Sequence, residues 1–310
     1  MTTTPFFSVV IPVYNRAALL GQALRSVLAQ SERDFEIVVV DDGSADNPSR
    51  TVEELADPRI VFVRQENRGG GAARNTGIDK ARGRFVAFLD SDDVFLPHHL
   101  AAMRRLVENA PGTAGYARIV VDRGEGRTFL KPPRAIRAGE DMATYLLCDR
   151  GFIPTSTMVV ERKIAEAVRF HENLAAAEDT DFAIRLSLAG QRFLMAEEPG
   201  VHWNDSGDPN RLSAGRKSAT MRQWIEDLRP RIPAKAYYGC LGWAYAKHVA
   251  MSDPLAALKL YLAALVRGCY RPSLAGIVFL QIFLSDRVYR KLADTAIARF
   301  GAGLRPGSAP

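Results

Sequence analysis

Short hydrophobic runs alternate with amphipathic stretches along the first third of the chain. The runs are too short for buried helices and predict buried strands at 8–12, 35–40, 60–63 and 85–89. Apolar residues recur at helical spacing over 20–28, and further helices are expected around 48–55 and after a glycine-rich loop at 67–77. Strand and helix alternate four times, which is typical of an α/β domain.

The pattern is looser after residue 93. It predicts helices over 100–109 and from residue 178, and strands at 116–122, 156–160 and 192–195. Two polar segments are expected as loops: 124–137, which could contact a second substrate, and 201–207, which is expected to be mobile. Residues 217–300 are nearly all helical in character. We therefore expect two domains, an α/β domain over 1–212 and a helical region over 213–310.

Acidic side chains follow two of the predicted strands. Asp41 and Asp42 come directly after the second strand, and Asp90-Ser91-Asp92-Asp93 follows the fourth. In an open parallel sheet, the carboxyl ends of the strands form the edge at which ligands bind. Carboxylates this close repel one another, so the run after residue 89 favours a site for a hard divalent cation. The alternative is a polar turn that caps the helix beginning near Pro97.

A phosphate-bearing ligand would explain these features together. Carboxylates at the strand ends can accept hydrogen bonds from a base or a ribose and can bind a metal on a diphosphate. Asn67, the glycine loop and Arg74 supply donors for the oxygen atoms of the same ligand. The loop matches neither GxxxxGK(S/T) nor GxGxxG, which argues against an NTPase and against a dehydrogenase.

Composition narrows the class of protein further. The chain has 310 residues, 47% hydrophobic and 25% charged, as expected for one large globular domain with a smaller appendage. The formal charge is +6, with basic residues thickening toward the C-terminus, which fits attraction to phosphates or anionic lipid. We see no nucleic-acid-binding motif and expect no nucleic acid as a partner. Cys148, Cys240 and Cys269 lack metal-ligand spacing and indicate reduced thiols.

Targeting signals are also informative. Residues 1–7 carry no basic region and no long apolar core, so we expect no secretory signal. The longest apolar stretch near the C-terminus, 274–284, is interrupted by Gln281 and is shorter than the ~20 residues needed to cross a bilayer. The expected location is the cytoplasm, either free or bound to the inner face of the cell membrane.

The polar segments together resemble a known family. Five motifs in this order are similar to the motif series of family 2 glycosyltransferases with the GT-A fold: Ser8–Arg16, Val40–Ser44, Asn67–Gly77, Phe88–Asp93 and Glu178-Asp179. The resemblance covers residues 6–205, about two thirds of the chain. It implies a Rossmann-like mixed sheet flanked by helices, here with a C-terminal helical extension.

The resemblance also implies an activity and a site. The activity would be an inverting transfer from a nucleotide-diphosphate sugar with Mn2+ or Mg2+. By motif position, the base would be framed by Pro12, Tyr14 and Asp42 with Asp41 beside them, while Asn67 and Arg74 would hold the ribose and diphosphate. Asp90-Ser91-Asp92 is this chain's form of the DxD motif. Asp92 would be the first metal ligand, and Asp90 would contact a ribose or the metal.

Asp179 would be the catalytic base, with Glu178 orienting the site. Inversion at an anomeric carbon needs one carboxylate to take a proton from the acceptor hydroxyl while the diphosphate departs from the opposite face. Asp179 falls in the first turn of a predicted helix, where we expect the macrodipole to favour its ionised form. The alternative is that both acids are ordinary helix N-terminal residues.

His202 and Trp203 are further candidates. Some related glycosyltransferases place a His after the acid pair, so His202 is a candidate metal ligand or diphosphate contact, unless it is simply packed or exposed. Trp203 could stack on an acceptor sugar or fill a gap in the core. The chain lacks the QxxRW motif of processive synthases, which favours the addition of one sugar per encounter.

The C-terminal helices interleave basic and aromatic residues over 234–300. This pattern suits a peripheral seat on an anionic membrane with a lipid-linked acceptor. The alternative is a helical subdomain that packs on the first domain or on a second subunit, so an oligomer is possible.

We therefore expect an inverting glycosyltransferase that uses a nucleotide-diphosphate sugar, with UDP favoured by family frequency. The acceptor would be a saccharide or a lipid-linked sugar in polysaccharide or glycolipid assembly. Two alternatives stay open: a nucleotidyltransferase, which would not need the pair Glu178-Asp179, and a catalytically silent protein that binds a sugar nucleotide or a polysaccharide.

Overall fold

The computed structural model describes residues 4–124, 126–174, 177–205 and 218–300. The chain divides into two compact units, the first formed by residues 1–121 and 153–204 and the second by 122–152 and 205–310. The predicted boundary near residue 212 lies outside the described residues. The second unit also includes 122–152, a segment that the sequence pattern did not separate from the first domain.

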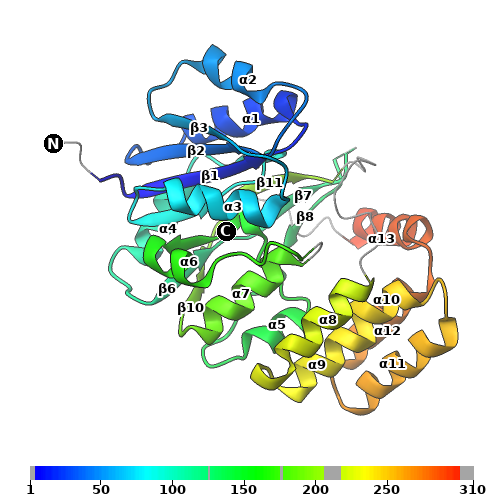
Figure 1. Ribbon diagram of the computed structural model, residues 1–310. Helices are drawn as coiled ribbons and strands as arrows, with labels where there is room; N and C mark the ends of the chain where they lie inside the picture. Colours follow the sequence, from blue (N-terminus) through cyan, green and yellow to red (C-terminus); the bar gives the residue numbers. More distant parts are fainter. Residues whose placement is uncertain (1–3, 125, 175–176, 206–217, 301–310) are drawn as a thin grey trace, which may run out of the picture. The chain divides into compact units, whose positions relative to one another are not determined.

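The first unit is built on a seven-stranded sheet in the order β10-β6-β9-β4-β1-β2-β3 (Figure 1). Its strands are β1 Phe7–Val13, β2 Phe35–Asp41, β3 Ile60–Arg64, β4 Phe85–Phe88, β6 Thr113–Tyr116, β9 Val159–Glu161 and β10 Arg192–Met195. β4, β1, β2 and β3 run parallel, whereas β9 is antiparallel to β4 and β6. The sheet is thus mixed, as expected.

Helices cover both faces of this sheet. They are α1 Ala17–Leu28, α2 Pro48–Leu55, α3 Gly70–Lys80, α4 His99–Val107, α6 Arg162–Val168 and α7 Glu178–Leu188. α1 and α2 lie on one face and α3 on the other (Figure 1). The central strands are therefore buried on both sides, which explains why their sequences are continuously apolar.

Close packing of α3 on β1 depends on a glycine. A Cβ at Gly77 would lie 2.2 Å from Cγ1 of Val10, so only glycine allows this helix to approach the strand so closely. The approach brings the N-terminal end of α3 close to the carboxyl ends of β1 and β2, where the acidic residues lie.

A second, smaller sheet changes two of the predictions. The expected strand at 116–122 is divided into β6 and β7 Ile119–Asp122, which belong to different sheets. The expected loop over 201–207 begins as a strand, β11 Val201–Asn204, which pairs antiparallel with β5 Asp93–Phe95. Both differences arise from pairing between segments far apart in the sequence, which local polarity does not report. Residues 206 and 207 lie outside the described part.

The second unit is mainly helical. Besides β8 Thr128–Lys131 it contains α5 Met142–Cys148, α8 Ser218–Leu228, α9 Ala234–Cys240, α10 Ala246–Val249, α11 Pro254–Val266, α12 Pro272–Phe283 and α13 Asp286–Phe300, with a 3-10 turn at Arg229–Arg231 and a π-helical turn at Leu241–Tyr245. Pro254 and Pro272 each open a helix, where a missing N–H costs nothing. No helix among the described residues combines the length and apolar character needed to cross a bilayer.

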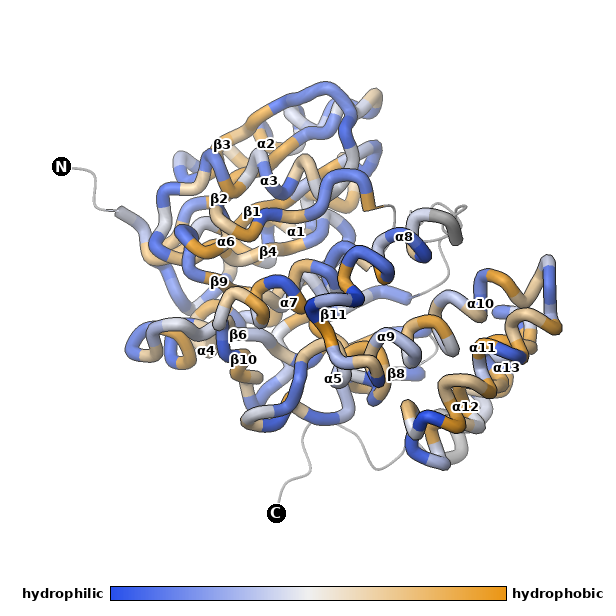
Figure 2. Tube along the Cα trace, turned by 60° about the horizontal axis from the view of Figure 1, so that its bottom comes forward, coloured by the Kyte–Doolittle hydropathy of each residue, from blue (hydrophilic) through white to orange (hydrophobic). Residues whose placement is uncertain are grey.

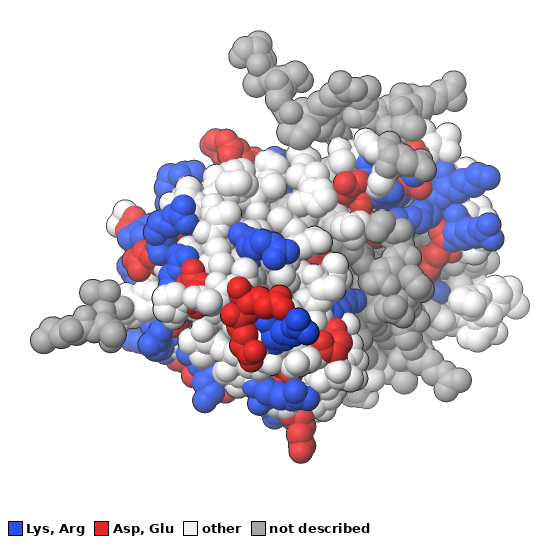
Figure 3. Space-filling model, turned by 90° about the horizontal axis from the view of Figure 1, so that it is seen from above, with Lys and Arg blue, Asp and Glu red and all other residues white. Residues whose placement is uncertain are grey.

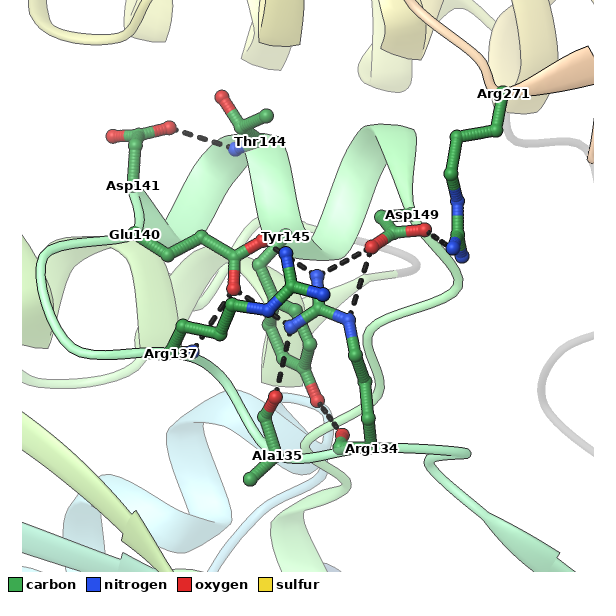
Figure 4. A network of polar contacts seen from close by, with 9 residues as sticks. All are labelled: Arg134, Ala135, Arg137, Glu140, Asp141, Thr144, Tyr145, Asp149 and Arg271. Atoms are coloured by element: carbon green, nitrogen blue, oxygen red, sulfur yellow. Dashed lines mark hydrogen bonds and ion pairs between the residues drawn. The ribbon is translucent and has the colours of Figure 1, made fainter.

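A cluster of charged residues holds the 131–140 segment in place within this unit (Figure 4). Arg134 donates to both carboxylate oxygens of Glu140, at 2.5 and 2.7 Å, and also pairs with Asp149. Arg271 donates to the other oxygen of Asp149 at 2.5 Å. The hydroxyl of Tyr145 donates to the carbonyl of Arg134 at 2.7 Å. The expected role of this polar segment toward a second substrate stays a prediction.

All three cysteines are free and buried in the second unit. The thiol of Cys148 donates to the backbone carbonyl of Lys235 at 3.3 Å. Burial raises the pKa of Cys240 to about 12. A thiol with so high a pKa is unreactive at neutral pH, which fits the expectation of free thiols without a disulfide framework.

Candidate active site

The acidic run after β4 is held by the side chain of Ser156 in a 3-10 turn at Thr155–Thr157. Asp90, Ser91 and Asp92 form the turn between β4 and β5, so β4 ends where its carboxylates begin. Ser156 Oγ accepts from the amide of Asp90 at 3.1 Å and donates to Asp93 Oδ2 at 2.5 Å. These two bonds to Ser156 hold the turn in place at both of its ends.

Arg74 joins the two acidic motifs. Its Nη2 donates to Asp90 Oδ1 at 2.6 Å, and its Nη1 donates to Glu178 Oε2 at 2.7 Å. Burial alone would lower the pKa of this guanidinium, but the attraction of Asp90 and Glu178 outweighs it and the pKa is raised. A single buried cation thus holds together acids that are 88 positions apart in the sequence, at 90 and 178.

Asp92 has a second arginine as its partner. Arg16, in the turn between β1 and α1, donates from Nη1 to Asp92 Oδ2 at 2.6 Å. Each carboxylate of the DxD sequence therefore faces a guanidinium. The sequence motif contained Arg16, but only as a neighbour of Tyr14, and its pairing was not predicted.

The strand-end acids after β2 bind backbone amides. Asp41 is fully buried, and its Oδ1 accepts from the amide of Ser44 at 2.8 Å. Asp42 accepts from the amides of Arg68 and Gly69 at 3.0 and 2.8 Å. Both carboxylates therefore shape loops at this edge, and Asp42 anchors the glycine loop at the start of α3.

Gly70 connects this loop to the two acidic motifs. A Cβ at Gly70 would lie 3.1 Å from Arg74 Nη1 and 3.4 Å from Glu178 Oε2. The backbone of the loop that Asp42 anchors therefore passes close to the side chains of Arg74 and Glu178. The structure thus brings Asp90 and Glu178 together at Arg74, and their roles in a ligand site stay predictions.

Asp179 is in the same neighbourhood, but its electrostatics differ from the prediction. Burial raises the pKa of its carboxyl above the ordinary value, against the lowering effect of hydrogen bonds from Thr180 and the charge of Arg74. The negative charge of Asp90 adds to the increase. The expected stabilisation of the ionised form at the start of α7 is therefore outweighed, because desolvation disfavours a charged carboxyl more than the helix end favours it.

Glu178 also has a raised pKa. Burial is the main cause, and Asp90 and Asp179 add to it, while Arg74 opposes it. Carboxyls with raised pKa values next to a buried arginine are typical of functional sites.

The residues expected around the base lie at the ends of β1 and β2. Pro12 is half-buried within β1, and Tyr14 is exposed just beyond it. The amide of Asn15 donates to Ser44 Oγ at 3.0 Å, and its Oδ1 accepts from the amide of Ala45 at 2.8 Å, which ties the two turns together. Asn67 is exposed in the loop before α3.

A divalent cation would find hard oxygen ligands here. Among the residues that the structure describes, no group of three or more His, Cys, Asp or Glu side chains is arranged to hold a metal ion. Mg2+ needs no such group, because it is commonly held by one or two carboxylates together with phosphates and water. Asp92 and Asp90 fit that mode, provided that the guanidinium of Arg16 gives way.

His202 and Trp203 lie in β11, where they pair with Val94 and Asp93 of β5. His202 is half-buried. Its role as a metal ligand and that of Trp203 toward an acceptor stay predictions.

Sequence reasoning missed a supporting layer beneath Arg74. The rings of Phe170 and Phe182 stack at 4.0 Å, and the guanidinium of Arg74 lies 5.4 Å from the Phe170 ring. Asn75 fixes this layer, because its side chain donates to the carbonyl of Phe170 and accepts from its amide, at 3.0 and 2.8 Å. The sequence motif contained Arg74 and Asn75, but it did not indicate Phe170 as their partner.

Charge outside the site is dispersed on the face shown in Figure 3, where Lys and Arg alternate with Asp and Glu. The net charge of +6 is therefore not gathered into one basic patch on that face. A protein that binds the phosphate backbone of a nucleic acid typically carries such a basic patch.

Comparisons with known proteins agree with these features. A family profile described as "Glycosyl transferase family 2" matches residues 8–169. The chain is 31% identical over 245 residues to the amylovoran biosynthesis glycosyltransferase AmsB of Erwinia amylovora, a match that covers 75% of this chain and 80% of that protein.

Solved structures share the fold. S. aureus TarS in complex with UDP-GlcNAc superposes with a TM-score of 0.60 at 18% identity, over 94% of this chain and 91% of that one. The mannosyltransferase PcManGT from Pyrobaculum calidifontis, in complex with GDP-Man and Mn2+, gives a TM-score of 0.57 at 19% identity, over 97% of this chain and 89% of that one. The likeness confirms the expected fold class.

Proposed function

Because the chain belongs to glycosyltransferase family 2, we propose that it transfers a sugar, with inversion, from a nucleotide-diphosphate sugar to a hydroxyl of a saccharide or lipid-linked acceptor. The observation that carries the proposal is the pairing of Arg74 with both Asp90 and Glu178. It joins the strand-end acids to the acid pair of α7, as a donor site beside a catalytic base requires.

Asp179 is the proposed base. It removes the proton of the acceptor hydroxyl while the oxygen attacks the anomeric carbon, and the bond from that carbon to the diphosphate oxygen breaks. A raised pKa suits this task, because a carboxylate whose pKa approaches the working pH accepts a proton more readily. Glu178, paired with Arg74, positions the helix end rather than taking the proton.

The strand ends hold the donor. Asp42 and the exposed ring of Tyr14 lie at adjacent strand ends and would frame the base, with Pro12 and Asp41 beneath them. Asn67 and Arg74 would hold the ribose and diphosphate, together with Asp90, which Arg74 contacts at 2.6 Å, and Ser91. Guanidinium and amide donors suit these oxygen atoms. UDP is the first candidate for the nucleotide, and TarS was solved with UDP-GlcNAc.

Mn2+ or Mg2+ would be held by Asp92, with Asp90 and, as a further candidate, His202. When bound, the cation would offset negative charge on the leaving diphosphate. PcManGT was solved with Mn2+, which supports the choice of ion to test first.

The name of one relative supports the proposed setting. AmsB is named for amylovoran biosynthesis, so we place this chain in polysaccharide or glycolipid assembly. We propose that it acts in the cytoplasm at the inner face of the cell membrane, where lipid-linked acceptors are presented.

A panel of nucleotide sugars tests the proposal. A bound donor raises the melting temperature of the folded protein, and we expect a rise of several degrees for one donor in the presence of Mn2+. Asp92→Ala should abolish the metal-dependent part of the rise. Asp179→Asn should keep the rise but lose transfer by about 10³-fold or more. Full transfer by Asp179→Asn would favour the nucleotidyltransferase alternative, and stabilisation without release of a nucleotide diphosphate would favour a binding protein.

A further inference from the structure

Two helices of the second unit expose hydrophobic side chains that the fold leaves uncovered. We propose that the α11–α12 face, formed by Leu255, Leu262, Leu265, Val266, Phe279 and Leu280, docks on the surface of a bilayer that contains anionic lipid. This inference does not depend on the sugar-transfer chemistry.

α11 is apolar on both sides, although only one side is packed. Ala257, Tyr261 and Ala264 are buried, whereas Leu255 and Val266 are 72% and 86% exposed. A helix that is hydrophobic all round normally lies in a protein core or contacts lipid. The apolar side chains on the outer side of α11 are therefore exposed to solvent, although a helix of this composition is normally buried or in contact with lipid.

α12 extends this surface. Leu274, Val278 and Ile282 are buried, while Phe279 and Leu280 on the outer side are exposed. The Phe279 ring lies 5.6 Å from the Tyr261 ring of α11, so Phe279 adjoins α11. Figure 2 shows hydrophobic residues along both helices. Several large apolar side chains exposed in one region mark an interaction surface rather than scattered surface residues.

The charge of this segment identifies the partner. Residues 254–285 contain no Asp or Glu, and their basic residues are Lys259, Arg267 and Arg271. Arg271 pairs with Asp149 and the guanidinium of Arg267 lies 4.1 Å from the Tyr238 ring, whereas Lys259 is exposed. Lys259 lies four residues after Leu255 and three before Leu262, so it is on the same outer side, and Arg267 directly follows Val266. Basic residues that flank an exposed apolar stripe suit anionic headgroups around an acyl surface.

A second copy of the chain fits less well. A symmetric contact places the same patch on both partners, which would add the positive charge of Lys259 from both chains to one apolar contact. Such like-charge contacts are unfavourable. On a bilayer, the long stem of Lys259 can lie along the apolar surface while its charge reaches the headgroups.

The helices would lie in the plane of the interface. α11 has 13 residues and α12 has 12, whereas a span needs about 20. Of the aromatic residues in this region, Tyr237 and Tyr261 are buried and do not contribute to the face. Aliphatic side chains and Phe279 take their place.

Flotation of the full chain with vesicles tests the proposal. We expect binding to vesicles of phosphatidylcholine mixed with phosphatidylglycerol, much weaker binding to phosphatidylcholine alone, and release by salt as charges are screened. Leu262→Glu should lower the bound fraction about tenfold, because a carboxylate is then placed against lipid and anionic headgroups. Lys259→Glu should lower it on anionic vesicles only.

Leu194→Glu, on β10 in the first unit, is the matched control. Leu194 is 43% exposed and Leu262 is 45% exposed, so both changes add a charge at an equally accessible leucine. The control should bind vesicles like the parent, and all variants should keep their melting temperature. An equal loss of vesicle binding in Leu262→Glu and Leu194→Glu would overturn the proposal, and so would binding without a preference for anionic vesicles.

Sedimentation of the lipid-free protein gives a second check. A dimer that Leu262→Glu dissolves would mean that a second copy covers the face, and the lipid proposal would be wrong. Donor-induced stabilisation should be unchanged in Leu262→Glu, so the outcome is separate from that of the proposed transfer reaction.

Discussion

Arg16 donates a hydrogen bond to Asp92 at 2.6 Å and so joins the turn after β1 to the acidic turn after β4. The guanidinium of Arg16 binds the carboxylate of Asp92, which is also the proposed ligand of the divalent cation. Arg16 and the cation therefore compete, unless the negative charge of a nucleotide diphosphate draws Arg16 away. Under the proposed role of Asp92, metal binding and donor binding would therefore depend on each other.

Arg16→Gln should therefore raise the affinity of the nucleotide-free protein for Mn2+ by about tenfold, because the competing cation is gone and a carboxylate next to a positive charge binds another cation less well. Titration calorimetry with Mn2+ alone measures this. Arg64→Gln, which loosens the 3.5 Å pair with Asp41 instead, should leave the affinity unchanged. An unaltered affinity in Arg16→Gln would show that the pair does not restrain metal binding.

Arg74→Met should destabilise the protein by about 3–5 kcal/mol, because Asp90 and Glu178 would lose their common buried partner. Urea unfolding measures the free energy. Arg50→Met, which removes an exposed pair with Glu54 on α2, should cost less than about 0.5 kcal/mol. Similar costs for both variants would mean that Arg74 is not the organising cation of the site.

The rate of transfer should depend on the ionisation of Asp179. Only its carboxylate form can accept the proton, and burial raises the pKa of this group. As pH falls through that raised pKa, the rate should drop about tenfold per pH unit, with the acid limb of kcat above the ordinary range for aspartate. A limb within the ordinary range would assign the base to another residue.

Asp179→Asn should stabilise the fold at neutral pH while it removes activity. A carboxyl whose pKa is raised on folding contributes favourably below the unfolded-state pKa, and this contribution is lost as pH rises through the folded-state pKa. The neutral amide avoids that loss, so the gain in melting temperature should be complete above the folded-state pKa and vanish toward acid pH. Thermal unfolding across pH gives the comparison, and a gain that persists in acid would contradict the assigned cause.

Gly77→Ala should destabilise the protein by about 1–3 kcal/mol, because the added Cβ would meet Val10 at 2.2 Å and push α3 from β1. Gly276→Ala in α12 is the control, since nothing lies within 4 Å of its Cβ position. It should be neutral or stabilising by up to about 1 kcal/mol. Chemical unfolding of both proteins separates close packing from helix propensity.

The order of apolar runs along the first third of the chain determined the strands and helices, and the motifs placed acids at the ends of β2 and β4. Those features are local: period and burial are written in neighbouring residues. The fold class and the family could be read from them.

The tertiary structure alone decided which charges meet. Arg16 and Asp92 are 76 positions apart, and Arg74 and Glu178 are 104 apart, so no local pattern could pair them. The same holds for β11, whose polar residues read as a loop until β5 supplies a partner. It holds as well for Asp179, whose pKa direction depends on how much water the folded chain removes. Sequence periodicity specifies which side chains are buried, whereas long-range packing specifies what each buried charge and each strand edge contacts.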